Sequence, residues 1–356
     1  MILKHSALHG EHIDLGARLV DFGGWEMPLS YPEGTIAEHL ACRNDAAAFD
    51  VSHLGTVRVN GPGSFGLLQR SLTNDLRKIA PGGAQYQHLL DEIDASVLDD
   101  IIVWWVAEER FDVMPNASNT ERVISVLGGH DVTEERAVIA VQGPRARERL
   151  STVSADAAAV GHFKVADFAF HGAPCRVAGT GYTGEDGVEC AVPSEVAPEF
   201  WRAVLGAGVK PAGLGARDTL RLESGLPLHG HELGAGITPL QAGLGWVVSW
   251  DKGPFMGRDA LDRERSAGIR RRLRGLLAEG RRPPRNGDGV LVDGEAAGVV
   301  TSGNYSPVLQ RGIALAFLPP ETPMGAKVEI ALRGGHVPAV VVKPPFQRLA
   351  GEETPS

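Results

Sequence analysis

Two adjacent carboxylates interrupt an otherwise apolar stretch in SVLDDIIVWW, residues 96–105. The stretch is typical of a β-strand, in which successive side chains point to opposite faces. Asp100 and Trp104 are therefore expected on one face and Asp99 on the other. An aspartate is uncommon inside a strand and costly to bury without a partner. The segment predicts either a functional site around one carboxylate or a strand end whose aspartates cap a turn.

A second candidate is GTGYTGEDGVE, residues 179–189, which begins with the G-x-G-x-x-G spacing of dinucleotide-binding folds. That spacing holds a pyrophosphate only where a strand ends and a helix begins. Here Asp186-Gly187 is a turn signal and VECAV is a second strand, so the unit reads as a hairpin. We therefore expect no nucleotide, and the glycines need another explanation.

Other polar groups are weaker candidates. The HGHE run at 229–232 has metal-binding residue types, but no further His or Cys cluster lies nearby in the sequence, so no metal is predicted. Ser52 and His53 are adjacent, and neighbours on a strand cannot form a catalytic pair. Asn116 and Ser118 are predicted to cap a helix start.

The elements around these residues form two similar stretches. GTVRVNGPGSFGLLQRSL (55–72) and AVIAVQGPRARERL (137–150) each read as a strand, Asn or Gln, Gly-Pro and a helix. The echo suggests two related α+β halves. Further helices are predicted at 34–46, 119–127, 195–207 and 214–225. After residues 265–285 the pattern changes to short β-runs with turns at Asp293-Gly294 and Gly334-Gly335, which predicts a separate β domain.

Composition limits the function classes. The 356 residues are 43% hydrophobic and 22% charged, as in a globular protein of two or three domains. The net charge of −9 argues against a nucleic-acid binder. The chain shows neither an apolar run long enough for a membrane span nor a signal peptide, so a cytoplasmic location is expected. The three cysteines, Cys42, Cys175 and Cys190, read as reduced core thiols.

Charge is unevenly distributed along the chain. Residues 262–285 contain nine arginines and three carboxylates, which gives this window a charge of +6. The window is either a solvated helix and linker or a docking surface for an acidic partner.

Several longer motifs resemble the aminomethyltransferase, or T-protein, family of the glycine cleavage system over roughly residues 5–348. The matching runs are LGARLVDFGGWEMPLSY (15–31), FDVSHLG (49–55), LTNDL (72–76), VLDDIIV (97–103), NASN (116–119), VQGP (141–144), GYTGEDGVE (181–189), GLGARDTLRLESGLPLHGHEL (213–233), ITPLQAGLGW (237–246) and TSGNYSPVLQRGIALA (301–316).

The resemblance implies an α+β fold with three domains in a cloverleaf. Two related α+β lobes would surround a central folate cavity and a C-terminal antiparallel β-barrel would follow. We therefore expect a folate-binding region at 1–265 with an inner lobe at about 53–136, a barrel at 272–348 and a disordered tail at 349–356.

The resemblance also implies the site. Asp100, the second residue of the D-D pair, is expected to lie beside the reacting pterin nitrogens and to manage a proton, whereas Asp99 is structural. Glu189 is expected to accept the amino group and ring N–H of the pterin, and Arg217 to complement an anionic part of folate. Further expected folate contacts are Leu54, Tyr86, Asn116 and Tyr182.

Two departures from the family pattern concern this site. Ala95-Ser96 stands where the family usually has Gly-Gly, with one extra residue in the loop, and Trp104 replaces a smaller or tyrosyl residue on the face of Asp100. Both are expected to influence the shape of the pocket.

The implied function is transfer of the methylene of aminomethyl-lipoate, carried on lipoylated H-protein, to tetrahydrofolate with release of ammonia. Tetrahydrofolate is then a substrate, and no metal, nucleotide, nucleic acid or membrane is expected. One alternative is a folate-dependent demethylase of a small methylated amine or sulfonium compound. Another is a non-enzymatic folate-binding relative, although its K-G-C-Y-x-G-Q-E signature is not present.

Overall fold

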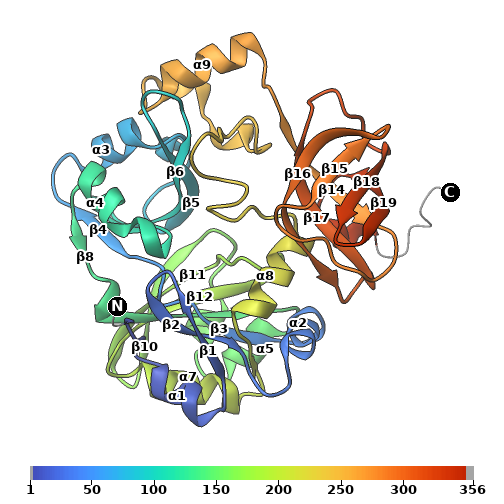
Figure 1. Cartoon of the computed structure of the whole chain (residues 1–356). Coiled ribbons are helices and arrows are strands. Elements are labelled where there is room, and N and C mark those ends of the chain that lie inside the picture. Colours follow the sequence, from blue (N-terminus) through green and yellow to red (C-terminus); the bar gives the residue numbers. More distant parts are fainter. Residues whose placement is uncertain (1–2, 350–356) are drawn as a thin grey trace. The chain divides into compact units, whose positions relative to one another are not determined.

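The computed structural model describes residues 3–349, which form two compact units. The first unit contains the chain up to Leu89, Asp99–Arg217 and Ser249–Met256. The second contains Leu90–Leu98, Asp218–Val248 and the chain from Gly257 onward. Figure 1 labels the elements of each unit. The tail that was predicted to be disordered lies, from residue 350, outside the described residues.

The first unit opens with a short helix and a hairpin. Helix α1 spans His9–Asp14, and strands β1 and β2 span Arg18–Phe22 and Trp25–Ser30. Phe22 pairs with Trp25, so two glycines turn the chain between the strands. The FGGW sequence thus specifies this hairpin.

A five-stranded sheet with the order β5-β6-β7-β4-β8 follows. Its strands are β4 (Val57–Asn60), β5 (Gly83–Leu90), β6 (Val97–Ala107), β7 (Arg110–Met114) and β8 (His130–Asp131), with helices α3 (Ser64–Ser71) and α4 (Thr120–Leu127) between them. Along β6, Asp99 and Ile101 are buried while Asp100 and Ile102 are half-buried. The predicted alternation of faces is confirmed.

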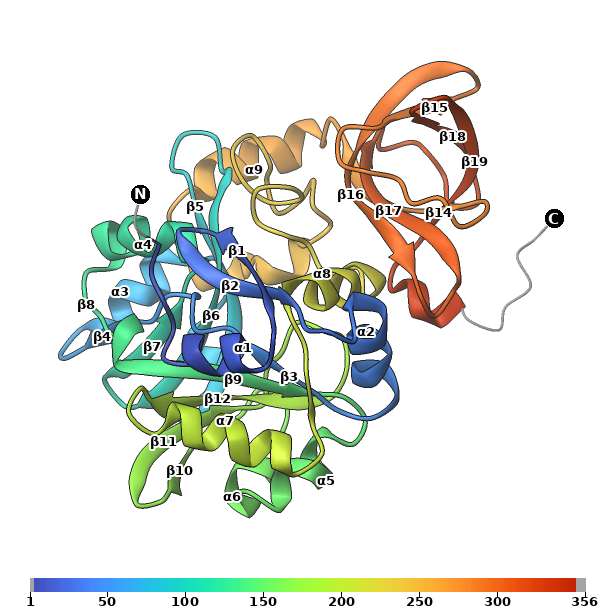
Figure 2. The same cartoon turned by 60° about the horizontal axis from the view of Figure 1, so that its bottom comes forward.

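A six-stranded sheet has the order β10-β11-β12-β9-β3-β13. Its strands are β3 (Ala47–Asp50), β9 (Arg136–Gln142), β10 (Val165–Phe170), β11 (Ala173–Ala178), β12 (Gly187–Pro193) and β13 (Lys210–Pro211), and the helices beside it are α2 (Thr35–Asn44), α5 (Ala146–Ser151), α6 (Ala155–Ala158) and α7 (Ala197–Gly206). Figure 2 shows α5, α6 and α7 gathered beside this sheet. Phe200 and Trp201 of α7 bury their rings against Ile139 and Val188 of the sheet core.

Two stretches that belong mostly to the first unit share one topology. We call β4 to β8 (57–131) the first repeat and β9 to β13 (136–211) the second. Each contains a strand, a helical segment, three antiparallel strands and a helix before a short final strand. In each, the last of the three strands pairs back to the first strand of the repeat, β7 to β4 and β12 to β9. The similar sequences at 55–72 and 137–150 therefore occupy the same place in two stretches of similar fold.

The second unit contains a closed antiparallel barrel with the order β14-β17-β16-β15-β18-β19. Its strands are β14 (Arg272–Ala278), β15 (Gly289–Val292), β16 (Glu295–Ser306), β17 (Arg311–Leu318), β18 (Lys327–Leu332) and β19 (Gly335–Val342), and pairing of β14 with β19 closes it. Leu276, Val300 and Ile330 belong to its buried core. The predicted C-terminal barrel is confirmed, whereas the exact domain boundaries remain a prediction.

The remaining helices complete the list. Helix α8 (Leu214–Glu223) begins in the first unit and ends in the second, which also contains α9 (Arg258–Ala267). Short 3-10 helices span Leu76–Lys78, Ala117–Asn119, Thr133–Glu135, Gly245–Val247, Trp250–Lys252 and Phe346–Leu349. The four further helices predicted from the sequence are thus found as α2, α4, α7 and α8. None of the helices in residues 3–349 is both long enough and apolar enough to cross a bilayer.

Candidate active site

Asp100 is linked to the neighbouring strand through Tyr86. Tyr86 on β5 donates its hydroxyl hydrogen to Asp100 Oδ2 at 3.0 Å. His88, two residues along the same face of β5, places Nε2 3.2 Å from the same hydroxyl. Since that hydroxyl hydrogen goes to Asp100, Tyr86 Oη is the acceptor for an Nε2–H of His88. Burial lowers the pKa of His88 to about 3, which keeps its ring neutral.

Asn116 contacts both carboxylates. Its Nδ2 lies 2.7 Å from Asp99 Oδ1 and 2.8 Å from Asp100 Oδ1, and 3.2 Å from the Asp100 carbonyl. The Asn116 amide lies beside the backbone of Asp99 and Asp100. It therefore reaches both carboxylates, although the two side chains project from opposite faces of β6. The helix-capping role predicted for Asn116 is wrong, because its side chain makes no cap bond and donates to the aspartates instead. A carboxylate oxygen is a strong acceptor, so the Asn116 amide hydrogens are directed to the two aspartates.

Asp99 is completely buried and fixed in place. It accepts from the Asn116 backbone N–H at 3.1 Å and from Asn119 Nδ2 at 2.9 Å. Burial is the main reason that the pKa of Asp99 is raised, and the adjacent negative charge of Asp100 adds to it. Asp99 therefore ties the loop after β7 to β6, whereas Asp100 is only half-buried.

Trp104 extends the face of Asp100 into the core. Its side chain is 1% exposed and packs with Ala84, Val165 and Ala178. The indole Nε1 has no hydrogen-bond partner among the described residues. The large ring therefore fills the apolar layer beneath this face.

Glu189 of β12, Thr180, Tyr182 and Arg217 form a second group of polar residues, which we call the second polar group. Thr180 Oγ1 donates to Glu189 Oε2 at 2.5 Å. The Arg217 guanidinium, on α8, lies 5.0 Å from the centre of the Tyr182 ring. Its Nη1 is buried and has no hydrogen-bond partner among the described residues. Burial lowers the pKa of Arg217, while the negative charge of Glu189 raises it.

The two polar groups lie near one another. Burial is the main reason that the pKa of Tyr86 is raised, but the charges of Asp100 and Tyr182 also contribute. Next to Leu54, burial and the charge of Arg217 lower the pKa of His53 to about 4. Leu54 itself is half-buried, and its carbonyl accepts from Arg136 at 2.7 Å. The structure thus places the predicted residues around one region of the first unit.

The glycines of the GTGYTG loop have a steric explanation. A Cβ on Gly179 would overlap the carbonyl of Gly161, and a Cβ on Gly181 would overlap the side chain of Gln142. Close backbone approach, rather than a phosphate, accounts for these residues. The hairpin itself is confirmed by the pairing of β11 with β12, in which Val177 lies opposite Cys190.

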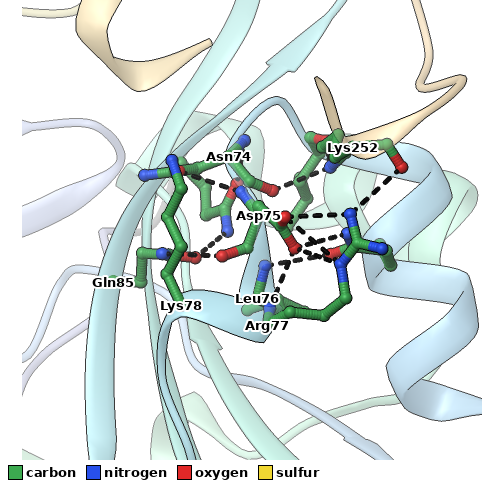
Figure 3. Close-up of polar contacts among 10 residues, drawn as sticks. Asn74, Asp75, Leu76, Arg77, Lys78, Gln85 and Lys252 are labelled. Atoms are coloured by element: carbon green, nitrogen blue, oxygen red, sulfur yellow. Dashed lines mark hydrogen bonds and ion pairs between the residues drawn. The ribbon is translucent and has the colours of Figure 1, made fainter. Parts of the chain in front are cut away.

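The LTND segment, residues 72–75, is joined to β5 and to Lys252 by hydrogen bonds, several of which Figure 3 shows. Asn74 Nδ2 donates to the carbonyl of Tyr86 at 3.2 Å, and Gln85 Nε2 donates to the carbonyl of Asp75 at 3.0 Å. The buried Lys252 ammonium donates to the Asn74 carbonyl at 2.7 Å and also to that of Leu72. These bonds fix the backbone from which Tyr86 projects.

Sequence reasoning did not single out His88, His53 or Lys252 as parts of this region. His88 could have been found, because it lies two residues from Tyr86 on one strand and so shares its face. Lys252 could not, because 166 positions of sequence separate the ammonium from the Tyr86 backbone that it supports.

The weaker candidates have structural roles. His229 and His231 lie against the carbonyls of Leu98 and Thr301, at 3.1 and 2.7 Å. Glu232 accepts from Arg221 at 3.2 Å. Ser52 donates to Asp50, while the ring of His53 packs edge-on against Phe22. All three cysteines are free and buried, as predicted.

Comparison with known proteins identifies the family. Residues 8–252 match the GCVT N-terminal domain, and residues 271–347 match the glycine cleavage T-protein C-terminal barrel domain. The chain belongs to the glycine cleavage T-protein family. The predicted membership is therefore confirmed for nearly the whole length of the chain.

Relatives of this T-protein family chain cover it almost completely. The aminomethyltransferase of Mycobacterium avium is 46% identical and that of Synechococcus elongatus 43%; both alignments cover 97% of this chain, and 97% and 96% of the relatives. The crystal structure of glycine cleavage system aminomethyltransferase T from Bartonella henselae matches with a TM-score of 0.90 at 33% identity, covering 97% of this chain and 98% of that one. The predicted α+β fold and enzyme class are confirmed.

Proposed function

We propose that the chain transfers the methylene group of aminomethyl-lipoate, carried on lipoylated H-protein, to tetrahydrofolate and releases ammonia. The observation that carries the proposal is the match to both T-protein domains, together with aminomethyltransferases similar over 97% of the chain. These relatives favour this reaction over demethylation of a small amine or sulfonium compound and over folate binding without catalysis.

The reaction requires proton transfer. The migrating carbon exchanges its bonds to sulfur and to the amine nitrogen for bonds to folate N5 and N10. The two folate N–H protons pass to the leaving ammonia and to the lipoyl thiol. We assign Asp100 to this proton handling, because Tyr86 and Asn116 hold its carboxylate oxygens and it is only half-buried.

Recognition of the pterin is assigned to the second polar group. Glu189 accepts the pterin amino group and the adjacent ring N–H, a pair that suits an ionised carboxylate. The buried Arg217 Nη1, which lacks a partner among the described residues, donates to an anionic part of folate. Tyr182 and Leu54, with Tyr86 and Asn116, are assigned as further contacts of the folate.

The partner is proposed to dock on a basic surface of the second unit. A cavity of about 880 Å³ there is lined by four basic side chains, Arg265, Arg272, Arg274 and Lys343, and by apolar residues. None of the residues that line it is acidic. Such a surface attracts an acidic partner and supports docking of H-protein.

Not every arginine in this basic window is available. Arg271 donates to Gln241 at 2.8 Å and to the Gly236 carbonyl at 2.8 Å, and it lies 4.5 Å from the Phe317 ring centre. Charge reversal there would disturb the fold. Arg272→Glu with Lys343→Glu is therefore the appropriate test, and Arg333→Glu, an exposed arginine outside the cavity, is its control.

The experiment that tests the function uses the purified chain, tetrahydrofolate and aminomethyl-loaded H-protein. We expect methylenetetrahydrofolate and ammonia in equal amounts. Production only from a small methylated amine, without H-protein, would instead establish the demethylase. Folate binding with no product from either donor would establish the non-enzymatic alternative.

Docking is tested in the same assay. The Arg272→Glu, Lys343→Glu variant should raise the KM for H-protein at low salt, and the difference should shrink as salt screens the charges. The KM for tetrahydrofolate should not change. Because Arg333→Glu reverses one charge and the double variant reverses two, an effect of Arg333→Glu about half as large would show that net charge alone is responsible. Roles in glycine catabolism and a cytoplasmic location remain predictions.

A further inference from the structure

A cluster of metal-ligating side chains lies at the start of the chain. His5, His9 and Glu26 each place one ligand atom within 4.8 Å of the others. They are the one group of this kind among the described residues, and no motif in the sequence pointed to them. Both histidines converge on one carboxylate oxygen: His5 Nε2 lies 3.3 Å and His9 Nε2 2.7 Å from Glu26 Oε2.

The backbone holds these side chains together. Lys4 N–H donates to the Gly24 carbonyl and Glu26 N–H donates to the Lys4 carbonyl, both at 2.9 Å, so the first residues lie alongside β2. Ser6 then anchors the segment by donating to Asp50 at 2.6 Å, and Leu8 is completely buried. Because these anchors point inward, His5 is left on the outside, beside Glu26.

The two imidazole rings are stacked. Their centroids are 3.8 Å apart and their planes differ by 6°, and both Nε2 atoms lie near Glu26 Oε2. His5 is 53% exposed, His9 18% and Glu26 34%, so water can reach the cluster and complete a coordination sphere.

We propose that His5, His9 and Glu26 bind one zinc ion, which fastens the first residues of the chain to the β1–β2 hairpin. Two imidazoles and a carboxylate are a donor set that zinc accepts in proteins. Tetrahedral zinc at ordinary bond lengths holds its donors about 3.3 Å apart. His5 Nε2 already lies 3.3 Å from Glu26 Oε2, whereas His9 Nε2, at 2.7 Å, must move away by about 0.6 Å. The exposed His5 ring turns to direct its nitrogen at the ion, and water fills the fourth position.

Zinc binds the lone pair of each Nε2. A neutral ring that carries its hydrogen on Nε2 must therefore change to the tautomer with hydrogen on Nδ1 before it coordinates the ion. The site is independent of the proposed reaction, so its failure would leave that proposal unaffected.

Three variants and one control test the site by calorimetric titration of zinc into the metal-free, untagged full-length chain. We expect one saturable site in the wild type, and at least about tenfold weaker binding in His5→Ala, His9→Ala and Glu26→Gln. His336→Ala is the matched control, because His336 also contacts a glutamate, Glu329 at 3.1 Å, but without a second histidine. It should bind zinc as the wild type does.

Thermal unfolding provides the second measurement. Without zinc, all four variants should unfold near the wild-type temperature, which shows that they fold. Zinc should raise the unfolding temperature of the wild type and of His336→Ala, but not of His5→Ala or His9→Ala. The proposal is overturned if the wild type shows no saturable binding at millimolar zinc, or if the three cluster variants bind zinc as tightly as the wild type.

Discussion

The two repeats of the first unit have one topology but different side chains at equivalent places. In the first repeat the middle strand of the three, β6, carries Asp99 and Asp100. In the second repeat the corresponding strand is β11, with the sequence APCRVA, which contains no carboxylate. Cys175 and Val177 of β11 enter the apolar core instead.

Acidic side chains on the neighbouring strands also differ in their partners. Asp112 of β7, in the first repeat, is held by Arg58 and Arg176, each at 2.9 Å. Glu189 of β12, in the second repeat, accepts from the neutral Thr180 and lies near Arg217. Asp112 is thus fixed by ion pairs, whereas Glu189 retains capacity to accept hydrogen bonds from a ligand.

This difference shows that the same fold carries residues with different proposed roles in the two repeats. The order β5-β6-β7-β4 in the first repeat matches β10-β11-β12-β9 in the second, although β8 pairs with β4 whereas β13 pairs with β3. The shared strand order, the helix placement and the Gly-Pro turns determine where a side chain projects. The proposed proton carrier lies on the first repeat and the proposed pterin acceptor on the second. Substitutions in either repeat should therefore separate catalysis from binding.

The largest effect is expected from Asp100→Asn in the first repeat. The amide keeps the size of the side chain but cannot take up a proton, so turnover should fall by roughly 10² or more while tetrahydrofolate binding remains nearly intact. Steady-state rates and a folate titration measure the two quantities. Asp167→Asn, on an exposed position of β10 in the second repeat, is the control and should retain full turnover. Wild-type turnover in Asp100→Asn would remove Asp100 from the mechanism.

Much of this arrangement could be predicted from local sequence. The alternation along β6, the 173–193 hairpin and the repeated Gly-Pro turn follow from side-chain period and turn chemistry, which act over a few residues. The Asp293-Gly294 turn is another example: Val292 pairs with Glu295, and both turn residues have positive φ values of 51° and 82°. Glycine and aspartate tolerate that conformation.

Long-range partners could not be predicted in this way. The Asn116 side chain was expected to cap a helix, but two carboxylates 16 and 17 residues earlier in the chain accept its hydrogens instead. The support of β5 by Lys252 and the meeting of His5 with Glu26 depend on how distant segments pack. Tertiary contacts of this kind override the local preference of a residue.

The glycines of the two Gly-Pro turns provide the next comparison. Gly61 and Gly143 both have positive φ values, 94° and 133°. A Cβ at Gly61 would meet open space, whereas one at Gly143 would overlap the backbone of Cys42 and Asp45. Gly61→Ala should therefore cost only the strain of the left-handed conformation, about 1–2 kcal/mol. Gly143→Ala should cost about 1–3 kcal/mol more.

Urea unfolding of the two glycine variants, side by side with the wild type, measures this difference. Equal destabilisation would show that the conformation alone matters and that the backbone near Gly143 moves aside. A far larger loss in Gly143→Ala would agree with a rigid packing of the second repeat against α2.

Of the two repeats, the first should be the more sensitive to acid. His88 is buried and its pKa is lowered to about 3, so it stays neutral in the folded chain, while the unfolded chain binds a proton below about pH 6.5. Its contribution to stability is therefore lost as the pH falls from about 6.5 towards 3. The loss amounts to at most about 1.4 kcal/mol per pH unit. His88→Gln should reduce the slope of stability against pH in this window.

Urea unfolding at pH 7 and pH 5 measures that slope. His130→Gln is the control, because this histidine of β8 is exposed. It should leave the slope unchanged. If His88→Gln and the wild type lose stability in parallel, protonation of His88 does not drive acid unfolding.

The smallest effect concerns the turn that precedes β6. Ala95 has a φ of 59°. Alanine adopts this conformation only with strain, whereas glycine adopts it without strain. The equivalent turn of the second repeat, His171-Gly172, has φ values of 48° and 83°. Ala95→Gly should relieve about 1–2 kcal/mol of strain but increase the entropy of the unfolded chain by about 0.4–1 kcal/mol. A net gain of up to about 1.6 kcal/mol is expected, measured by urea unfolding.

His171→Gly should relieve the same strain, but it also removes the stacking of the ring on Phe170, with 4.1 Å between centroids, and the contact with Glu199 at 3.1 Å, so its gain should be smaller. Ala95 differs in being completely buried, so its methyl group also contributes contacts. If Ala95→Gly destabilises the chain while His171→Gly stabilises it, those contacts outweigh the backbone strain. Alanine at position 95 would then stabilise the turn more through its packing than it destabilises the turn through its backbone conformation.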